Sequence, residues 1–127
     1  AVKALGRRWK RVSRRGRELK DLGDADRHHL RIDAKKLRYA FEAFAPLFDA
    51  REGERFLKRL KALQDALGAL NDAAVATRLV ERLAPKGAGA AEASRLLLAR
   101  EARRGRQMKA AVAAMEALAD GRRPWDI

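Results

Sequence analysis

One segment of the chain, residues 24–48, carries three parallel stripes that only an α-helix can align. Its apolar residues recur at alternating steps of four and three, which is the spacing of a buried helical seam. At about 100° per residue, a cationic row lies roughly 120° round the helix from that seam, and a second apolar stripe lies beyond the row. This arrangement predicts basic side chains held in a crevice, with packing on both sides. The buried seam consists of Leu30, Ala34, Leu37, Phe41, Phe44 and Phe48. The cationic row consists of His28, Arg31, Lys35 and Arg38. The outer apolar stripe consists of Ile32, Tyr39, Ala43 and Pro46.

The rest of the chain also has helical periodicity. No segment alternates with period two, so we expect no strand, and 127 residues suffice for one domain with a single core. The pattern predicts an all-α, antiparallel four-helix bundle with helices over about 2–22, 25–48, 50–83 and 90–119. Beyond residues 24–48, the predicted seams are Val2, Leu5, Trp9, Val12 and Leu19; Phe56, Leu60, Leu63, Leu67, Leu70 and Ala74; and Leu98, Met108, Val112 and Met115.

Several residues are typical of helix ends. Gly23 is expected to stop the first helix, and Asp24 or Asp26 to cap the second. Pro46 predicts the end of the second helix or a kink near it, because proline lacks a backbone N–H. Asp49 and Glu52 have the spacing of a capping box that opens the third helix. The segment from 84 to 89, rich in Gly and Pro, predicts the break before the fourth helix.

The charge balance indicates a polyanionic partner. Thirty Lys and Arg against seventeen Asp and Glu give a formal net charge of +13. Residues 1–48 hold fourteen of these cations and six acids, a surplus of eight. Such a field attracts nucleic acid, anionic membrane or polyphosphate. We therefore expect the anion site on the first two helices; the alternative is a basic surface that only improves solubility.

The composition argues against several classes of site. The chain has no Cys and only two His, with no HxxE or ExxH spacing, so we expect no disulfide, no metal site and no cofactor. No catalytic nucleophile can be identified either, so we expect a protein that is not an enzyme. No apolar run approaches the ~20 residues that a membrane span requires, so we expect no membrane partner.

Two stretches resemble a known family. Residues 60–72, LKALQDALGALND, are similar to one recurrent helix of the CHAD family, the conserved histidine α-helical domain. A second segment of this chain is similar to the family's histidine-containing helix; it reads His28-x-Leu30-Arg31-Ile32-x-x-Lys35-x-Leu37-Arg38-Tyr39. A whole CHAD domain has two such bundles, and only one such helix is present in this chain. The resemblance therefore implies the second half of a CHAD architecture, and it implies binding of inorganic polyphosphate through basic helix faces.

The candidate site follows from the row and the resemblance together. We expect His28, Arg31, Lys35 and Arg38 to bind polyphosphate, joined by a stripe of the first helix that includes Arg7, Lys10 and Arg14. Tyr39, Asp65 and Asp72 are expected to support them, the two carboxylates by orienting Arg31 or Arg38. His29 and Lys36 lie off the row and are expected on the surface. Gly68, inside a helix, suggests that a bulky side chain or another backbone approaches there.

Two other functions remain open. The same basic helices could bind nucleic acid, with Tyr39, Trp9 and Trp125 to stack bases. An Asp65–Asp72 pair holding Mg²⁺ would instead indicate an enzyme that acts on phosphoanhydrides. Under the preferred reading the protein is cytoplasmic or bound to polyphosphate granules, where it recruits substrate or targets another domain. The outer apolar stripe predicts a second copy of the chain, or a missing N-terminal half-domain, as its cover.

Overall fold

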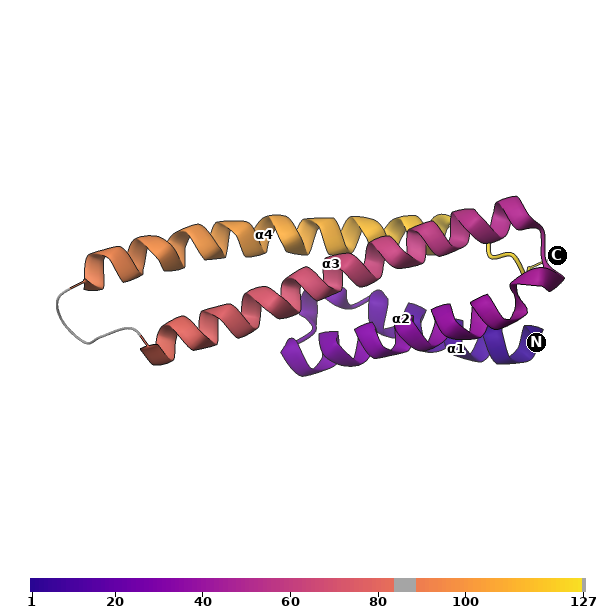
Figure 1. Cartoon of the computed structure of the whole chain (residues 1–127), viewed down its shortest axis with the longest axis horizontal. Coiled ribbons are helices and arrows are strands. Elements are labelled where there is room, and N and C mark those ends of the chain that lie inside the picture. Colours follow the sequence, from indigo (N-terminus) through magenta and orange to yellow (C-terminus); the bar gives the residue numbers. More distant parts are fainter. Residues whose placement is uncertain (84–88, 127) are drawn as a thin grey trace.

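The protein is an all-α bundle, which confirms the predicted fold class. A computed structural model describes residues 1–83 and 89–126, and this part of the chain contains no strand. The helices are α1 (Val2–Gly16), α2 (Asp24–Phe44), α3 (Ala50–Leu83) and α4 (Ala90–Asp120). Two 3₁₀ turns, η1 (Leu19–Asp21) and η2 (Ala45–Leu47), follow α1 and α2 respectively. Figure 1 shows neighbouring helices running in opposite directions.

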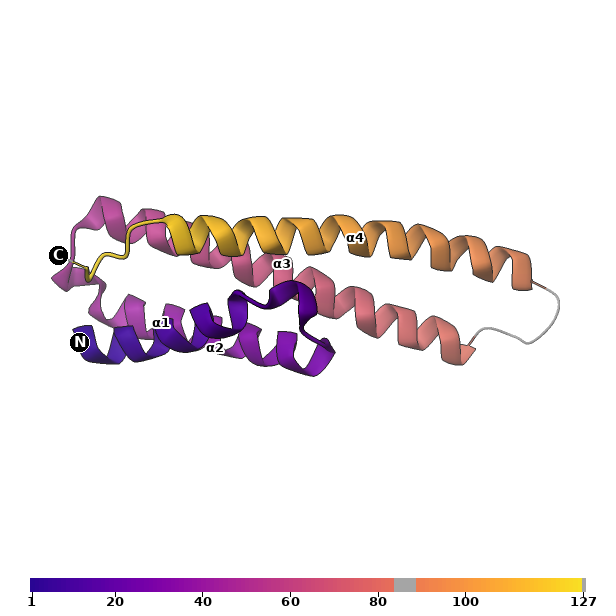
Figure 2. The same cartoon turned by 180° about the vertical axis from the view of Figure 1, so that it is seen from behind.

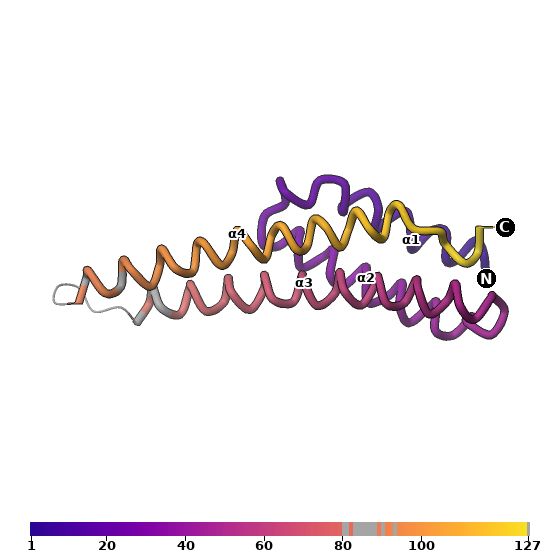
Figure 3. The backbone as a smooth tube through the Cα atoms, turned by 90° about the horizontal axis from the view of Figure 1, so that it is seen from above, coloured from indigo at the N-terminus to yellow at the C-terminus, as the bar shows by residue number. Residues whose placement is uncertain are grey.

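The helices differ greatly in length. α3 and α4 have 34 and 31 residues and form a long hairpin, whereas α1 and α2 have 15 and 21. The short pair packs along the half of the hairpin that lies nearest both termini (Figures 1 and 2). The other half of the hairpin projects past α1 and α2, as the view from above makes clear (Figure 3). Only half of the hairpin therefore lies against the short pair.

The core follows the predicted seams with two exceptions. Leu98 was predicted to be buried but is 65% exposed, and Val2 is also exposed. Leu98 is in the first third of α4. This segment of α4, orange in Figure 3, projects past α1 and α2. Val2 is the first residue of α1, at the end of the bundle. The buried apolar cluster includes Leu5, Val12, Leu19, Leu30, Leu37, Phe41, Phe56, Leu60, Leu63, Leu67, Leu70, Ala111, Met115 and Leu118.

The first helix is shorter than predicted, because it ends at Gly16 and not near residue 22. Gly16 is buried, and a Cβ atom there would overlap the side chain of Met115 on α4. The chain then turns through η1, which places Leu19 in the core. A glycine at this position allows the end of α1 to approach α4 closely. This contact depends on a residue about 100 positions away, so the periodicity of the first helix could not reveal it.

Two other helix ends differ in detail from the prediction, and the start of α3 agrees with it. The cap of α2 is Gly23, and neither Asp24 nor Asp26 caps the helix with its side chain. α2 ends at Phe44 because Pro46 lies in the following 3₁₀ turn. At the start of α3, the N–H of Glu52 donates to Oδ1 of Asp49 at 3.0 Å, which confirms the Asp49 cap. Most of the predicted break, residues 84–88, lies outside the described residues; Gly89, with φ 101°, precedes α4.

The C-terminal tail belongs to the core. Trp125 is only 5% exposed, and its ring packs edge-on against Phe56 with 5.2 Å between centroids. Phe41 lies 6.3 Å from the same indole and 5.0 Å from Phe56. Trp125 therefore cannot stack bases, and the expectation that it could serve a nucleic-acid binder was wrong. It instead covers the aromatic end of the bundle.

Candidate polyanion-binding site

Close packing between α2 and α3 positions the cationic row. The seam of α2, which includes Leu30 and Leu37, is buried together with the leucines of α3. The cationic row lies next to this seam round the circumference of α2, so its residues lie at the edge of the contact between α2 and α3. Arg31, Lys35 and Arg38 are half-buried there, whereas His28 is exposed near the start of α2. The predicted crevice is therefore real on the α3 side of the row.

Arg31 is the residue most clearly held by this seam. Its guanidinium lies against Gly68 of α3, where a Cβ atom would be 3.6 Å from Nη2 and 3.7 Å from Nε. Gly68 has no side chain, so the planar guanidinium can rest on the backbone of α3. A Cβ atom at these distances would make only an ordinary van der Waals contact, so alanine would also fit, and the glycine costs about 1 kcal/mol relative to it. The prediction that a bulky side chain approaches Gly68 is confirmed.

Arg38 lies two turns further along the same edge. Its Nε is 3.7 Å from Oε1 of Glu42, an ion pair that is too long for a hydrogen bond. Its guanidinium carbon is 5.1 Å from the centre of the Tyr39 ring, within the range of a cation–π interaction. Tyr39 itself is 57% exposed, so its ring flanks Arg38 from the solvent side. Tyr39 thus occupies a place from which it can support the row.

Both arginines carry a buried donor without an acceptor. Nε of Arg31 and Nε of Arg38 are shielded from solvent, and neither has a hydrogen-bond partner among the described residues. A buried donor left unpaired costs about 1–3 kcal/mol, more when it is charged. Arginine can offer such donors to phosphate oxygens as a planar fork. Nε of Arg31 and Nε of Arg38 thus lack a hydrogen-bond partner among the described residues, although Arg38 still forms its ion pair with Glu42.

Two further residues of α3 share the side of that helix that carries Gly68. Gln64 and Lys61 precede Gly68 by four and seven positions, which places all three on one side of α3. Gln64 is 7% exposed and its Oε1 has no partner in the described chain, while Lys61 is exposed. Their spacing from Gly68 was visible in the sequence, but the sequence interpretation did not assign them to the site.

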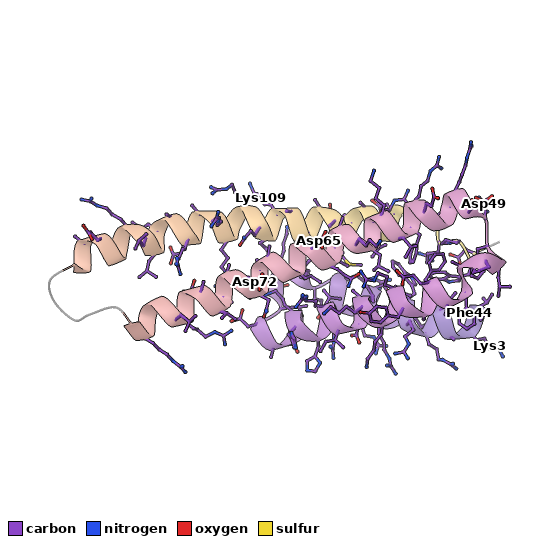
Figure 4. The ribbon with its side chains drawn as sticks, in the orientation of Figure 1. Lys3, Phe44, Asp49, Asp65, Asp72 and Lys109 are labelled. Atoms are coloured by element: carbon purple, nitrogen blue, oxygen red, sulfur yellow. The ribbon has the colours of Figure 1, made fainter. Side chains whose placement is uncertain are left out.

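The two candidate carboxylates of α3 lie elsewhere. Asp65 and Asp72 are exposed, and neither forms an ion pair with Arg31 or Arg38 in the described part of the chain (Figure 4). Asp72 instead lines a pocket with Arg100 and Arg103 of α4. The structure therefore does not bear out the expectation that Asp65 and Asp72 orient Arg31 or Arg38.

Besides Glu42, which pairs with Arg38, a second carboxylate lies at the other end of the row: Asp24, at the start of α2. It forms an ion pair with the buried Arg27, whose Nη1 also donates to the carbonyl of Leu22 at 3.1 Å. Arg104 of α4 lies 3.4 Å from the same carboxylate. Asp24 and Arg27 also line a shallow cleft with His28 and Arg31. Arg27 is thus held by contacts at the start of α2, and the exposed His28 and the half-buried Arg31 form this end of the row.

The cationic residues of α1 do not join the row. Arg7, Lys10 and Arg14 line a different pocket together with Asp33 of α2. Asp33 follows Arg31 by two residues and so lies about 200° further round α2. His29, which was predicted to be merely on the surface, is exposed but also lines this second pocket. The structure therefore divides the predicted site residues between two opposite sides of α2.

The described residues hold no group of three His, Cys, Asp or Glu side chains that could bind a metal ion. Among these same residues, no helix is both long and apolar enough to cross a membrane.

The fold and the site together define a class of protein: an all-α bundle with a partly buried cationic row along its second helix. The chain belongs to the CHAD family, because the CHAD domain matches residues 1–81. The match covers α1, α2 and most of α3, including the whole row and Gly68. Comparison with curated proteins and with solved structures found no match.

Proposed function

We propose that the chain is a non-catalytic binding module for inorganic polyphosphate, and that His28, Arg31, Lys35 and Arg38 form the binding row. The observation that carries the proposal is the alignment of Arg31, Lys35 and Arg38, three half-buried cations, along one side of α2, with Arg31 resting on α3 at Gly68. Their partly exposed side chains can donate to phosphate oxygens. Membership of the CHAD family supports the same ligand.

The shape of the row suits a linear polyanion. Ten residues separate His28 from Arg38, so the row extends about 15 Å at 1.5 Å per residue. A polyphosphate chain carries roughly one negative charge per unit, and it can meet one cation at each turn of the helix. Arginine supplies the forked donors, whereas lysine and protonated histidine supply compact ones.

Nucleic acid is the less suitable partner. Binding of single strands relies on aromatic rings that are free to stack on bases. Trp125 is buried in the core, and Trp9 is half-buried beneath Arg123, whose guanidinium carbon is 5.1 Å from the indole. Tyr39 alone of the three candidate rings is exposed, and it already contacts Arg38. The surface thus offers charge but little stacking.

A catalytic role has little support from the geometry. Asp65 and Asp72 lie away from the row, so a metal held by them would not reach a phosphate bound at Arg31. We therefore favour recruitment or targeting, in the cytoplasm or at polyphosphate granules. A phosphate-release assay with Mg²⁺ tests this directly, and sustained release of phosphate from polyphosphate would overturn it.

The binding proposal is tested by substitution with a matched control. Arg31→Ala, Lys35→Ala and Arg38→Ala together should weaken polyphosphate binding by about a hundredfold or more, since each lost charged hydrogen bond is worth about 1.5–3 kcal/mol. Arg51→Ala, Arg55→Ala and Lys58→Ala remove the same charge from exposed positions of α3. Equal losses in the two triple variants would point to a diffuse basic surface. Competition with DNA of equal charge should leave polyphosphate bound.

A further inference from the structure

A second cationic pocket lies at the junction of α1 and α2. It has a volume of about 480 Å³, and its lining contains five cations and one carboxylate. α1 supplies all five cations because its buried side is narrow, with only Leu5, Val12 and Gly16 buried. The remaining circumference of the helix is free to carry charge. The lining residues are Arg7, Lys10, Arg11, Arg14 and Arg15 of α1, with His29 and Asp33 of α2.

This pocket is separated from the row by the body of α2. Going round α2 from Arg31 to Asp33, one path crosses the buried seam and the other crosses the outward stripe that contains Ile32 and Tyr39. α-Helices are about 10 Å in diameter with their side chains, so a short anion cannot contact both places. The two histidines are adjacent in the chain, yet His28 lines the cleft at the row and His29 lines the second pocket.

The charges of the pocket are largely uncompensated. Arg15 forms an ion pair with Asp33 at 3.5 Å, which ties α1 to α2. The other four cations of the lining form no ion pair within the described residues. A concave surface lined by charges of one sign focuses its field on the opening and concentrates counter-ions there. No Phe, Tyr, Trp or large apolar side chain lines the pocket, so only the ring of His29 could stack on a nucleoside base.

We infer that this pocket is a second anion-binding site, independent of the row, and that it takes a short run of phosphate groups without an attached base. The inference rests on the proposed function for the ligand's chemistry, but its location and residues are separate. The bundle would then hold two phosphate segments, one on each side of α2. Asp33 acts as a positioning residue, because it directs Arg15 across the mouth between the helices.

Inorganic tripolyphosphate is the probe, since it is too short to contact both sides. Calorimetry at low salt should show that each parent chain binds two equivalents of tripolyphosphate. Arg7→Ala, Arg11→Ala and Arg14→Ala together should leave one equivalent, and so should the Arg31, Lys35 and Arg38 triple variant. The Arg51, Arg55 and Lys58 variant should keep two. A single equivalent in the parent, or two in the α1 variant, would overturn the second site without touching the first.

The two histidines provide a readout that does not depend on stoichiometry. The chain has two histidines, so their ring C–H signals can be followed by NMR at constant pH during titration with tripolyphosphate. In the parent both should shift. In the Arg7, Arg11 and Arg14 variant the His29 signal should stay in place while that of His28 still shifts. A His29 signal that never moves contradicts the second site, whereas a His28 signal that never moves contradicts the proposed row.

Discussion

The guanidinium of Arg31 rests on the backbone of α3 at Gly68, where a Cβ atom would lie 3.6 Å from Nη2. This contact joins α2 to α3 beside their shared core and places the Arg31 guanidinium against the α3 backbone. The contact therefore connects Gly68, which is unfavourable inside a helix, to Arg31, a cation of the candidate site.

Substitutions of Gly68 should separate helix stability from binding. Gly68→Ala adds only an ordinary van der Waals contact with Arg31, so binding should be unchanged and stability should rise by about 0.5–1 kcal/mol. Gly68→Leu should displace the guanidinium and weaken polyphosphate binding about tenfold or more. Gly105→Leu on α4, where nothing lies within 4 Å of the added atom, is the matched control. Thermal melts and calorimetry measure both effects, and a Gly68→Leu protein that binds like the parent would contradict the contact's role.

Salt should weaken binding in proportion to the cations that meet phosphate. Each neutralised phosphate contributes about 0.7–0.9 to the slope of log affinity against log salt for nucleic acids, and polyphosphate should behave similarly. Replacing Arg31, Lys35 and Arg38 by Ala should therefore reduce the slope by about 2. Affinity measured at several chloride concentrations gives the slope. A nearly flat line for the parent would exclude binding through several cations at once.

Gly16→Ala should destabilise the fold, because the added Cβ overlaps Met115 of α4. Overpacking of this kind costs about 1–3 kcal/mol. Gly6→Ala, also on α1, is the control, since nothing lies within 4 Å of its added atom. Urea unfolding should show a lower midpoint for Gly16→Ala alone. Similar midpoints for the two variants would mean that α1 does not need this close approach.

Trp125→Ala should be among the most damaging single substitutions. Removing a buried aromatic side chain costs about 3–5 kcal/mol, a large share of the 5–15 kcal/mol that stabilises a typical domain. The exposed Leu47→Ala should cost little by comparison. Circular dichroism melts of the two variants test the difference. A Trp125→Ala protein as stable as the parent would show that residues 122–126 are dispensable for the fold, although they pack on Phe56.

We also predict that polyphosphate promotes self-association of the chain. Tyr39 and Leu47 are 57% and 68% exposed, and Ala43 and Pro46 are exposed beside them. A second copy related by two-fold symmetry would cover this apolar stripe. Two basic faces repel each other unless an anion lies between them, so the ligand should strengthen the dimer. Light scattering with and without polyphosphate tests this, with Tyr39→Glu expected to abolish dimers. A monomer under both conditions would contradict it.

The sequence by itself determined the helices, because helical periodicity is a local property. The seams of α2 and α3 were found from steps of three and four, and the cationic row followed because its members share one helix. The Asp49 cap was found for the same reason, since donor and acceptor are three residues apart. Such relationships need only the geometry of one helix.

The tertiary structure decided everything that depends on where one helix meets another. Leu98 is exposed because α1 and α2 are too short to reach it, and Gly16, the last residue of α1, lies against Met115 of α4. Trp125 is buried because the tail returns over Phe56. The cations of α1 lie on the opposite side of α2 from Arg31, although both sets are basic stripes in the sequence. Helical periodicity gives the angular position of each face about the axis of its helix, but only the packing of the helices decides which faces meet.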